Sequence, residues 1–321
     1  MPTDTRTRQA PSTQARWAIP AAGAVVGGLL VALVVGGGAA PTSLEGIAGP
    51  GPLVSWGLPL LRAVATTASI LVVGLLLYAA VLGPQGRKGV LSQVGRRDVV
   101  KAGWVAAVWS LAALLTAIWS LAWALGLPVS KTITPDVVST YAWSVGSVRA
   151  FLLVAIIAAV IAVVSIFTAT VTGAGASLAG ALIAVALPAL TGHASSLGSH
   201  GVAMTSDVVH ALAVTVWVGG LVILLFHAVR NDPGTMRAVP VFRTVATWSV
   251  VFLAISGAGA AFARMNSVSE LWSTSFGILI SLKVLLFFGL LMTARTMQSR
   301  SSTPAWRRVR RSSASAVSRR C

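Results

Sequence analysis

The chain contains the stretch GSVRAFLLVAIIAAVIAVVSIFTATV, residues 146–171, in which Arg149 is the single charged side chain among 26 residues. A helix needs about 20 predominantly apolar residues to cross the hydrocarbon core of a bilayer. The stretch shows none of the alternation of apolar and polar residues that a half-buried strand requires. It therefore predicts a helix that spans a membrane.

Runs of the same kind recur along the chain. They are predicted at residues 17–40, 58–82, 100–126, 146–171, 174–192, 205–229, 241–263 and 275–298. Hydrophobic residues make up 56% of the 321 residues and charged residues only 10%, whereas soluble domains carry about a quarter charged residues. Only helices and closed barrels satisfy their backbone hydrogen bonds in lipid, and no strand period is present. We therefore predict an all-α, polytopic membrane helical bundle with about eight transmembrane helices.

Basic residues separate the connections into two classes. Arginines and lysines gather in both tails and in the connections after the second and sixth spans, whereas the connections after the odd-numbered spans hold only Lys131 and Arg264. The positive-inside rule then predicts a multi-pass protein of the cytoplasmic (inner) membrane with both termini in the cytoplasm. The predicted parts are a basic tail (1–16), a four-helix membrane part (17–171), a second four-helix membrane part (172–298) and an arginine-rich cytoplasmic tail (299–321).

The two terminal regions each allow a second interpretation. The first span, 17–40, follows a basic region as a signal peptide does, but its apolar run exceeds the roughly 7 to 15 residues of a signal h-region, so we interpret it as an anchor. The net charge of +17 is a feature that soluble nucleic-acid-binding proteins also show. Because the basic residues lie on one side of the predicted spans, we expect anionic membrane lipid as the partner of the tail, and no nucleic acid.

The polar chemistry of the chain gathers in TGHASSLGSHGVAMTSDVVHALAVTVWVGG, residues 191–220, which holds three of the four histidines. On the predicted sixth span Met204, Asp207 and His210 recur every third residue, close to the outer surface. Imidazole binds copper or zinc, and a thioether favours Cu(I), whereas magnesium and calcium prefer more oxygen ligands. We therefore predict a copper site with the candidate ligands His193, His200, Met204, Asp207 and His210.

Each of these residues also has a structural interpretation. A histidine near a membrane surface is often an interfacial side chain, and we expect this of His227 at the cytoplasmic end of the sixth span. Asp207 suits the start of a helix, where the macrodipole favours an acid. Met204 is a residue type that often only fills space. The clustering of rare ionisable groups favours the functional interpretation for the group as a whole.

Three cations fall inside predicted spans and are candidates for supporting polar roles. Arg62 and Arg149 lie near the outer ends of the second and fourth spans, from where their side chains can extend to the interface. Lys283 lies about eight residues, roughly 12 Å, inside the eighth span. We expect it to lie near Asp207 or Glu270 in a polar cavity, with a lysine that stretches to the interface as the alternative.

Several segments of the chain carry a resemblance to a known family. They are GHA (192–194), DVVHALAVTVWVGGL (207–221), FRTVATWSVVFLAISGAGAAFAR (242–264) and LWSTSFGILISLKVLLFFGLLMTARTMQSR (271–300). The chain resembles the copper resistance D family (CopD) of inner-membrane proteins. The likeness covers the fifth to eighth spans best, and residues 240–298 correspond to the core domain of that family.

The resemblance implies copper handling, either movement of copper across the cytoplasmic membrane or its delivery there. It also implies roles for His193, Asp207, His210 and Lys283, and a periplasmic copper-binding partner of the copper resistance C type. Similar actinobacterial domains are often fused to a second domain that resembles a cytochrome c oxidase assembly factor. We do not expect that domain among these 321 residues, which leaves a natural short form, a fragment and a frame-disrupted product as alternatives, and a cytochrome oxidase assembly factor is a candidate partner.

Two other functions remain open from the sequence. His193 and His210 are candidates for the two axial ligands of a haem in a membrane electron carrier. A non-catalytic assembly subunit for a copper-containing cytochrome oxidase would use the helices mainly to bind partners. We expect no enzymatic activity, since GxSxG, HExxH and Walker A motifs are absent and the single cysteine is Cys321.

Overall fold

The computed structural model of the protein describes residues 50–191, 200–232 and 234–264, together with Trp272, Ser281 and Leu285. Met1–Gly257 belong to one compact unit and Ala258–Cys321 to a second. The predicted first span, 17–40, lies outside the described residues, as does the predicted eighth span, 275–298, apart from two single residues. The side chains whose contacts are described below belong to the first unit, whereas Lys283 belongs to the second.

The described part of the chain is helical, with two isolated β-bridges as the only extended pairings within it. Six helices are long and apolar enough to cross a membrane, which confirms the all-α, polytopic membrane bundle. The long helices are α2 (Pro52–Leu77, continued by the π-helical turn η1, Tyr78–Leu82), α3 (Gln93–Leu125), α6 (Gly146–Phe167), α7 (Val171–Ala189), α8 (His200–Val229) and α9 (Thr235–Arg264). The short elements are η2 (Arg87–Gly89), α4 (Val129–Thr132) and α5 (Pro135–Tyr141).

Helix α3 begins two turns earlier than its predicted span, 100–126. Ser92 caps the helix, because its side chain accepts a hydrogen bond from the backbone N–H of Gly95 at 3.1 Å. The charged residues from Arg96 to Lys101, which suggest a connection by their polarity, therefore form the first turns of a helix. This difference matters for function because it places Asp98 on a rigid element instead of in a loop.

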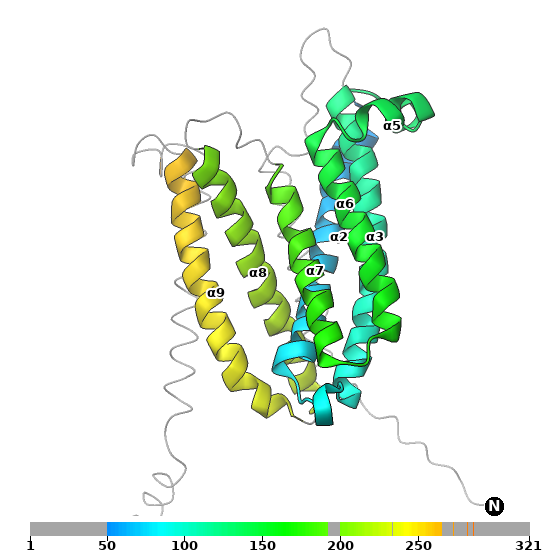
Figure 1. Ribbon diagram of the computed structural model, residues 1–321. Coiled ribbons are helices and arrows are strands. Elements are labelled where there is room, and N and C mark those ends of the chain that lie inside the picture. The colour runs from blue at the N-terminus through cyan, green and yellow to red at the C-terminus, as the bar shows by residue number, and fades with distance from the viewer. Residues whose placement is uncertain are drawn as a thin grey trace, which may run out of the picture. The chain divides into compact units, whose positions relative to one another are not determined.

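Helix α2 is central to the first unit and packs against α3, α7 and α8. Figure 1 shows α7 between α6 and α8, with α9 on the other side of α8. Small residues allow the backbones to approach closely: a Cβ added at Gly219 would lie 2.4 Å from the carbonyl oxygen of Ile70, and one added at Gly74 would lie 2.3 Å from that of Gly219. Such small-residue crossings are typical of helices that pack within membranes.

The two ends of the bundle differ in charge. One end, called here the basic end, contains the η1–α3, α6–α7 and α8–α9 connections (residues 83–92, 168–170 and 230–234). There Arg96 donates hydrogen bonds to the carbonyls of Ser165 and Ile166 at the C-terminus of α6, where the helix dipole favours a cation. The opposite end contains α4, α5 and the start of α8, and it carries exposed tryptophans, as membrane interfaces do.

Candidate functional site

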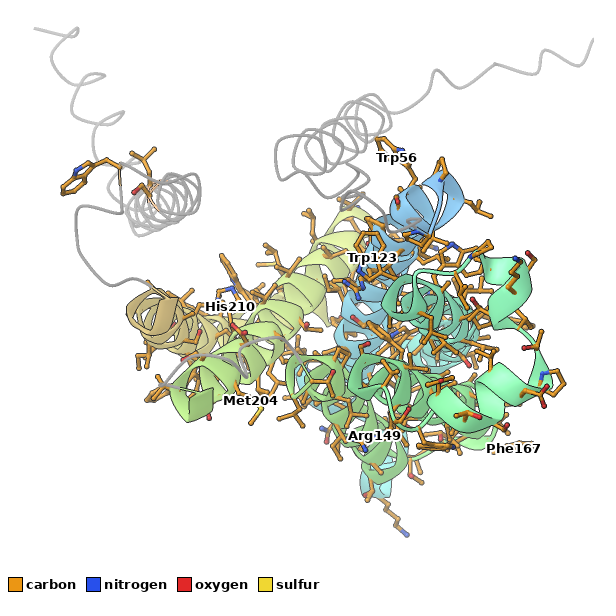
Figure 2. The ribbon with its side chains drawn as sticks, turned by 90° about the horizontal axis from the view of Figure 1, so that it is seen from above. Trp56, Trp123, Arg149, Phe167, Met204 and His210 are labelled. Carbon is orange, nitrogen blue, oxygen red and sulfur yellow. The ribbon has the colours of Figure 1, made fainter. Side chains whose placement is uncertain are left out.

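Three of the predicted ligands lie in the first half of α8, at the end opposite to the basic end. Met204 and Asp207 are half-buried, and His210 is exposed. We call these three residues the α8 N-terminal group. Figure 2 shows Met204 and His210 on different sides of α8. This agrees with helical geometry, since six residues turn through about 120° net, and the same geometry places Asp207 between the two.

The imidazole of His210 is oriented by helix α9. Its Nδ1 lies 3.2 Å from the hydroxyl oxygen of Ser256, and that hydroxyl donates its proton to the carbonyl of Leu253 at 3.2 Å. With the Ser256 proton in its bond to Leu253, His210 donates Nδ1–H to Ser256 Oγ and carries its lone pair on Nε2. A neighbouring group that holds one ring nitrogen in this way is typical of metal-binding histidines.

The rest of the predicted copper site lies outside the described residues. This holds for His193, for the side chain of His200 and for Lys283, including its expected contact with Asp207. Among the residues that the structure describes, no group of three histidine, cysteine, aspartate or glutamate side chains is arranged to hold a metal ion. The five-residue copper site thus stays a prediction, of which the structure places Met204, Asp207 and His210.

The two supporting arginines occupy different depths. Arg62 lies ten residues into α2, about 15 Å from the start of the helix, which is deeper than the predicted boundary at residue 58 suggests. Its guanidinium carbon lies 5.9 Å from the ring centre of Phe151. Arg149 is exposed in the first turn of α6. Neither arginine is placed among the predicted copper ligands.

A second polar cluster, which the sequence analysis did not single out, lies in the last turn of α8. His227 Nε2 is 2.8 Å from Asp98 Oδ2, and His227 Nδ1 is 2.8 Å from Asp232 Oδ2. The side chains of Asp98 and His227 are 0% and 1% exposed, whereas that of Asp232 is 28% exposed. We call these three residues the α8 C-terminal cluster. The prediction of an interfacial His227 is wrong, because α3 and the α8–α9 connection enclose its ring between two carboxylates.

The aromatic ring of Tyr78 covers one face of this imidazole. Tyr78 is the first residue of η1 and is fully buried, and its ring stacks on His227 with 4.0 Å between centroids and 19° between planes. The close approach of α2 to α8 at Gly74 and Gly219 lies just before this contact on both helices. π-Helical turns such as η1 are frequent at functional sites.

Two cations lie at the rim of the cluster. Lys101 Nζ is 3.0 Å from Asp98 Oδ1, and Arg230 Nε is 3.9 Å from Asp232 Oδ2. Both cations also lie over the ring of Phe226, at 5.1 and 5.2 Å from its centre. The negative charge of each carboxylate is therefore met by a cation as well as by the imidazole.

The comparisons with known proteins concern the C-terminal part of the chain. Residues 236–320 match the family model described as copper resistance protein D. This C-terminal part of the chain is thus similar to the copper resistance protein D family. The curated proteins and the solved structures give no match. The resemblance seen in the sequence is confirmed, and with the six apolar helices it gives the protein a copper-related function in a membrane.

The match to copper resistance protein D begins within the first turn of α9. It includes Ser256, which orients His210, and it includes Lys283. Asp207 and His210 themselves precede the matched residues, as does the whole α8 C-terminal cluster. The family match therefore connects to the α8 N-terminal group through the contact between α8 and α9.

Proposed function

We propose that the protein moves copper across the cytoplasmic membrane or delivers copper there, and that the α8 N-terminal group takes part in binding the ion together with His193 and His200. The observation that carries this proposal is the contact of His210 with Ser256, since it joins an imidazole with an oriented lone pair to a helix of the copper resistance protein D match. A non-enzymatic role suits these side chains, because binding and release of an ion require no reacting group.

The distribution of charge supports one orientation in the membrane. Under the positive-inside rule the basic end faces the cytoplasm, so that the start of α8 lies on the outer side of the membrane. Copper that arrives from outside then meets Met204, Asp207 and His210 first. A mixture of imidazole, carboxylate and thioether ligands suits an ion that must leave again, unlike a closed site of four cysteines.

This orientation also determines where partners would meet the protein. A periplasmic copper-binding protein of the copper resistance C type would dock at the end that carries the α8 N-terminal group. Lipid would surround the apolar outer faces of the long helices, where Trp104 and Phe167 are among the most exposed side chains. A cytochrome oxidase assembly factor is a further candidate partner within the membrane.

Metal analysis of purified protein tests the proposed site. Wild-type protein in detergent, equilibrated with Cu(I) and separately with Cu(II), should retain copper, and the double variant His193→Ala/His210→Ala should lose at least tenfold in affinity. The matched control is Thr205→Ala, which removes an exposed polar side chain of α8 between Met204 and Asp207. It should bind copper as wild type does. Equal copper binding by wild type and the double variant would remove the site assignment.

Visible spectra and measurements of copper accumulation in cells distinguish the copper site from the haem carrier and the assembly subunit. A Soret band in the purified protein that disappears in His210→Ala would support the haem carrier in place of the copper site. In cells, copper accumulation should change between wild type and the double variant. Unchanged accumulation together with retained binding to an oxidase complex would favour the assembly subunit.

A further inference from the structure

The α8 C-terminal cluster fixes the number of protons that its three side chains share. A neutral imidazole has one N–H donor and one nitrogen lone pair. The Nδ1 of His227 shares a hydrogen bond with Asp232 Oδ2 at 2.8 Å. Its Nε2 lies 2.8 Å from Asp98 Oδ2, which is the distance of an ion pair without the direction of a well-formed hydrogen bond. A nitrogen lone pair that close to a carboxylate oxygen is repelled, so the pair of His227 and Asp98 needs a proton in addition to the one shared with Asp232.

We propose that Asp98, His227 and Asp232 form a proton-binding site at the basic end of the bundle, which exchanges one proton with the adjoining aqueous side through Asp232. The ligand of the site is the proton that the two short contacts require beyond the one on a neutral imidazole. The proposal stands on the geometry of α3, α8 and the α8–α9 connection, and it is independent of copper handling.

The surroundings of His227 favour the protonated ring. Tyr78 presents its π face to the imidazole at 4.0 Å, a position in which an aromatic ring attracts a cation. His227 also lies in the last turn of α8, where the helix dipole favours positive charge. Phe226 approaches the ring edge-on, with centroids 5.6 Å apart, and brings no charge of its own.

The bound proton places the positive charge of an imidazolium inside the cluster. From α3 the ring faces Asp98, which Lys101 pairs, and from the α8–α9 connection it faces Asp232, near Arg230. The residue that α9 brings close, Thr235, is uncharged and donates its hydroxyl proton to the Asp232 carbonyl at 2.8 Å. The side chains of Lys101 and Arg230 are 46% and 61% exposed, so water screens both cations and the imidazolium is the buried positive charge beside Asp98.

Of the three side chains in the cluster, Asp232 is the one that solvent reaches, so the proton enters and leaves through it. Asp98 and His227 are closed to solvent, whereas Asp232 is 28% exposed and lies between the spans Gly201–Val229 and Thr235–Ala261. Asp232 therefore joins the closed pair to the aqueous phase. Ionisable groups are costly to bury and are retained in membrane helices mainly where they have a function.

Nitrogen NMR of the full chain in lipid nanodiscs tests the site, since ring ¹⁵N shifts distinguish an imidazolium from either neutral tautomer. The protein has only four histidines, so the variant His227→Gln identifies the signal of His227 by its loss. At pH 7.5 we expect this signal to be that of an imidazolium. In Asp98→Asn, and likewise in Asp232→Asn, the ring should lose its proton at a pH lower by about one to three units, a tenfold to thousandfold weaker hold on the proton.

Controls make the outcome decisive. Asp136→Asn makes the same change of carboxylate to amide in α5, at the opposite end, and should leave the His227 titration unchanged. If Asp98→Asn fails to fold, the surface variant Asp232→Asn and the wild-type spectrum still decide. A neutral His227 in wild type between pH 5 and 8, or identical titrations in wild type and Asp232→Asn, would overturn the proposal.

Discussion

Two histidines of helix α8, His210 in its first half and His227 in its last turn, have opposite surroundings. His210 and His227 are 17 residues apart, about 25 Å along the helix. His210 is exposed, and its Nδ1 is held by one hydroxyl, that of Ser256. His227 is 1% exposed, and both of its nitrogens meet carboxylates at 2.8 Å. The same side chain on the same helix is thus oriented for exchange at one end and enclosed at the other.

This difference shows that neighbours decide the chemistry of an imidazole. In the first half of α8 the imidazole of His210, together with a carboxylate and a thioether, suits a metal ion that binds and leaves. At the end of α8 two carboxylates supply the negative charge that keeps a proton on the ring. In the proposed orientation the first histidine serves the outer side of the membrane and the second the cytoplasmic side.

Substitution of His210 and of His227 by alanine should give the largest difference in the free energy of unfolding. His227→Ala leaves the buried Asp98 and the partly exposed Asp232 without the group between them, so we expect a loss of about 3–5 kcal/mol in the free energy of unfolding. His210→Ala removes one exposed ring and should lower the free energy of unfolding by about 0.5 kcal/mol, well below the loss expected for His227→Ala. Unfolding in mixed detergent micelles, followed by circular dichroism, measures both. Equal losses from the two substitutions would contradict the contrast between the ends.

The crossing of α2 and α8 lies between the two ends and holds Tyr78 over His227. A Cβ at Gly219 would meet the Ile70 carbonyl at 2.4 Å, and backbone atoms cannot move aside without separating the helices. Gly219→Ala should therefore destabilise the fold by about 1–3 kcal/mol and weaken the stack of Tyr78 on His227. Gly257→Ala in α9, where nothing lies within 4 Å, is the matched control and should be neutral or stabilising. A loss of stability in the control alone would show that the crossing is not tight.

Substitution of Ser256 tests the role of its hydroxyl in the α8 N-terminal group. Ser256→Ala removes the acceptor that holds Nδ1–H of His210, so copper affinity should fall about tenfold while the fold is retained. Ser256→Thr keeps the hydroxyl and should stay within about threefold of wild type. Isothermal titration with copper in detergent measures the affinities. Equal affinity in all three proteins would mean that the hydroxyl does not orient a copper ligand.

Hydropathy predicts the long helices well because the length of an apolar run directly reflects the thickness of a bilayer. It misses the start of α3, since a polar turn of helix and a polar connection look alike by composition. Ser92 was the available signal, because serine is a preferred cap residue and its side chain does accept from Gly95. The helix that begins there carries Asp98 to the buried ring of His227.

The α8 N-terminal group is predictable because its members are close in sequence on one helix. The α8 C-terminal cluster is not, since Asp98 reaches His227 only after α2, α3 and α8 have packed. Two signals were present: an aspartate among three basic residues at the start of α3, and a histidine five residues before Asp232. Neither spacing identifies the partner, because the pairing depends on the tertiary contact between helices that are distant in sequence.

Substitution of Lys101 has the smallest expected effect on stability. It tests how much the exposed cations beside the α8 C-terminal cluster contribute to the stability of the buried Asp98. Its Nζ is 3.0 Å from Asp98 Oδ1, but its side chain is 46% exposed, so water screens much of the attraction between Lys101 and Asp98. Lys101→Gln should therefore lower the free energy of unfolding by no more than about 1 kcal/mol. Raising the salt concentration should reduce the difference between wild type and variant, whereas His227→Ala should keep its large effect at high salt. A loss for Lys101→Gln as large as that for His227→Ala would mean that the cation, and not the imidazole, stabilises the buried Asp98.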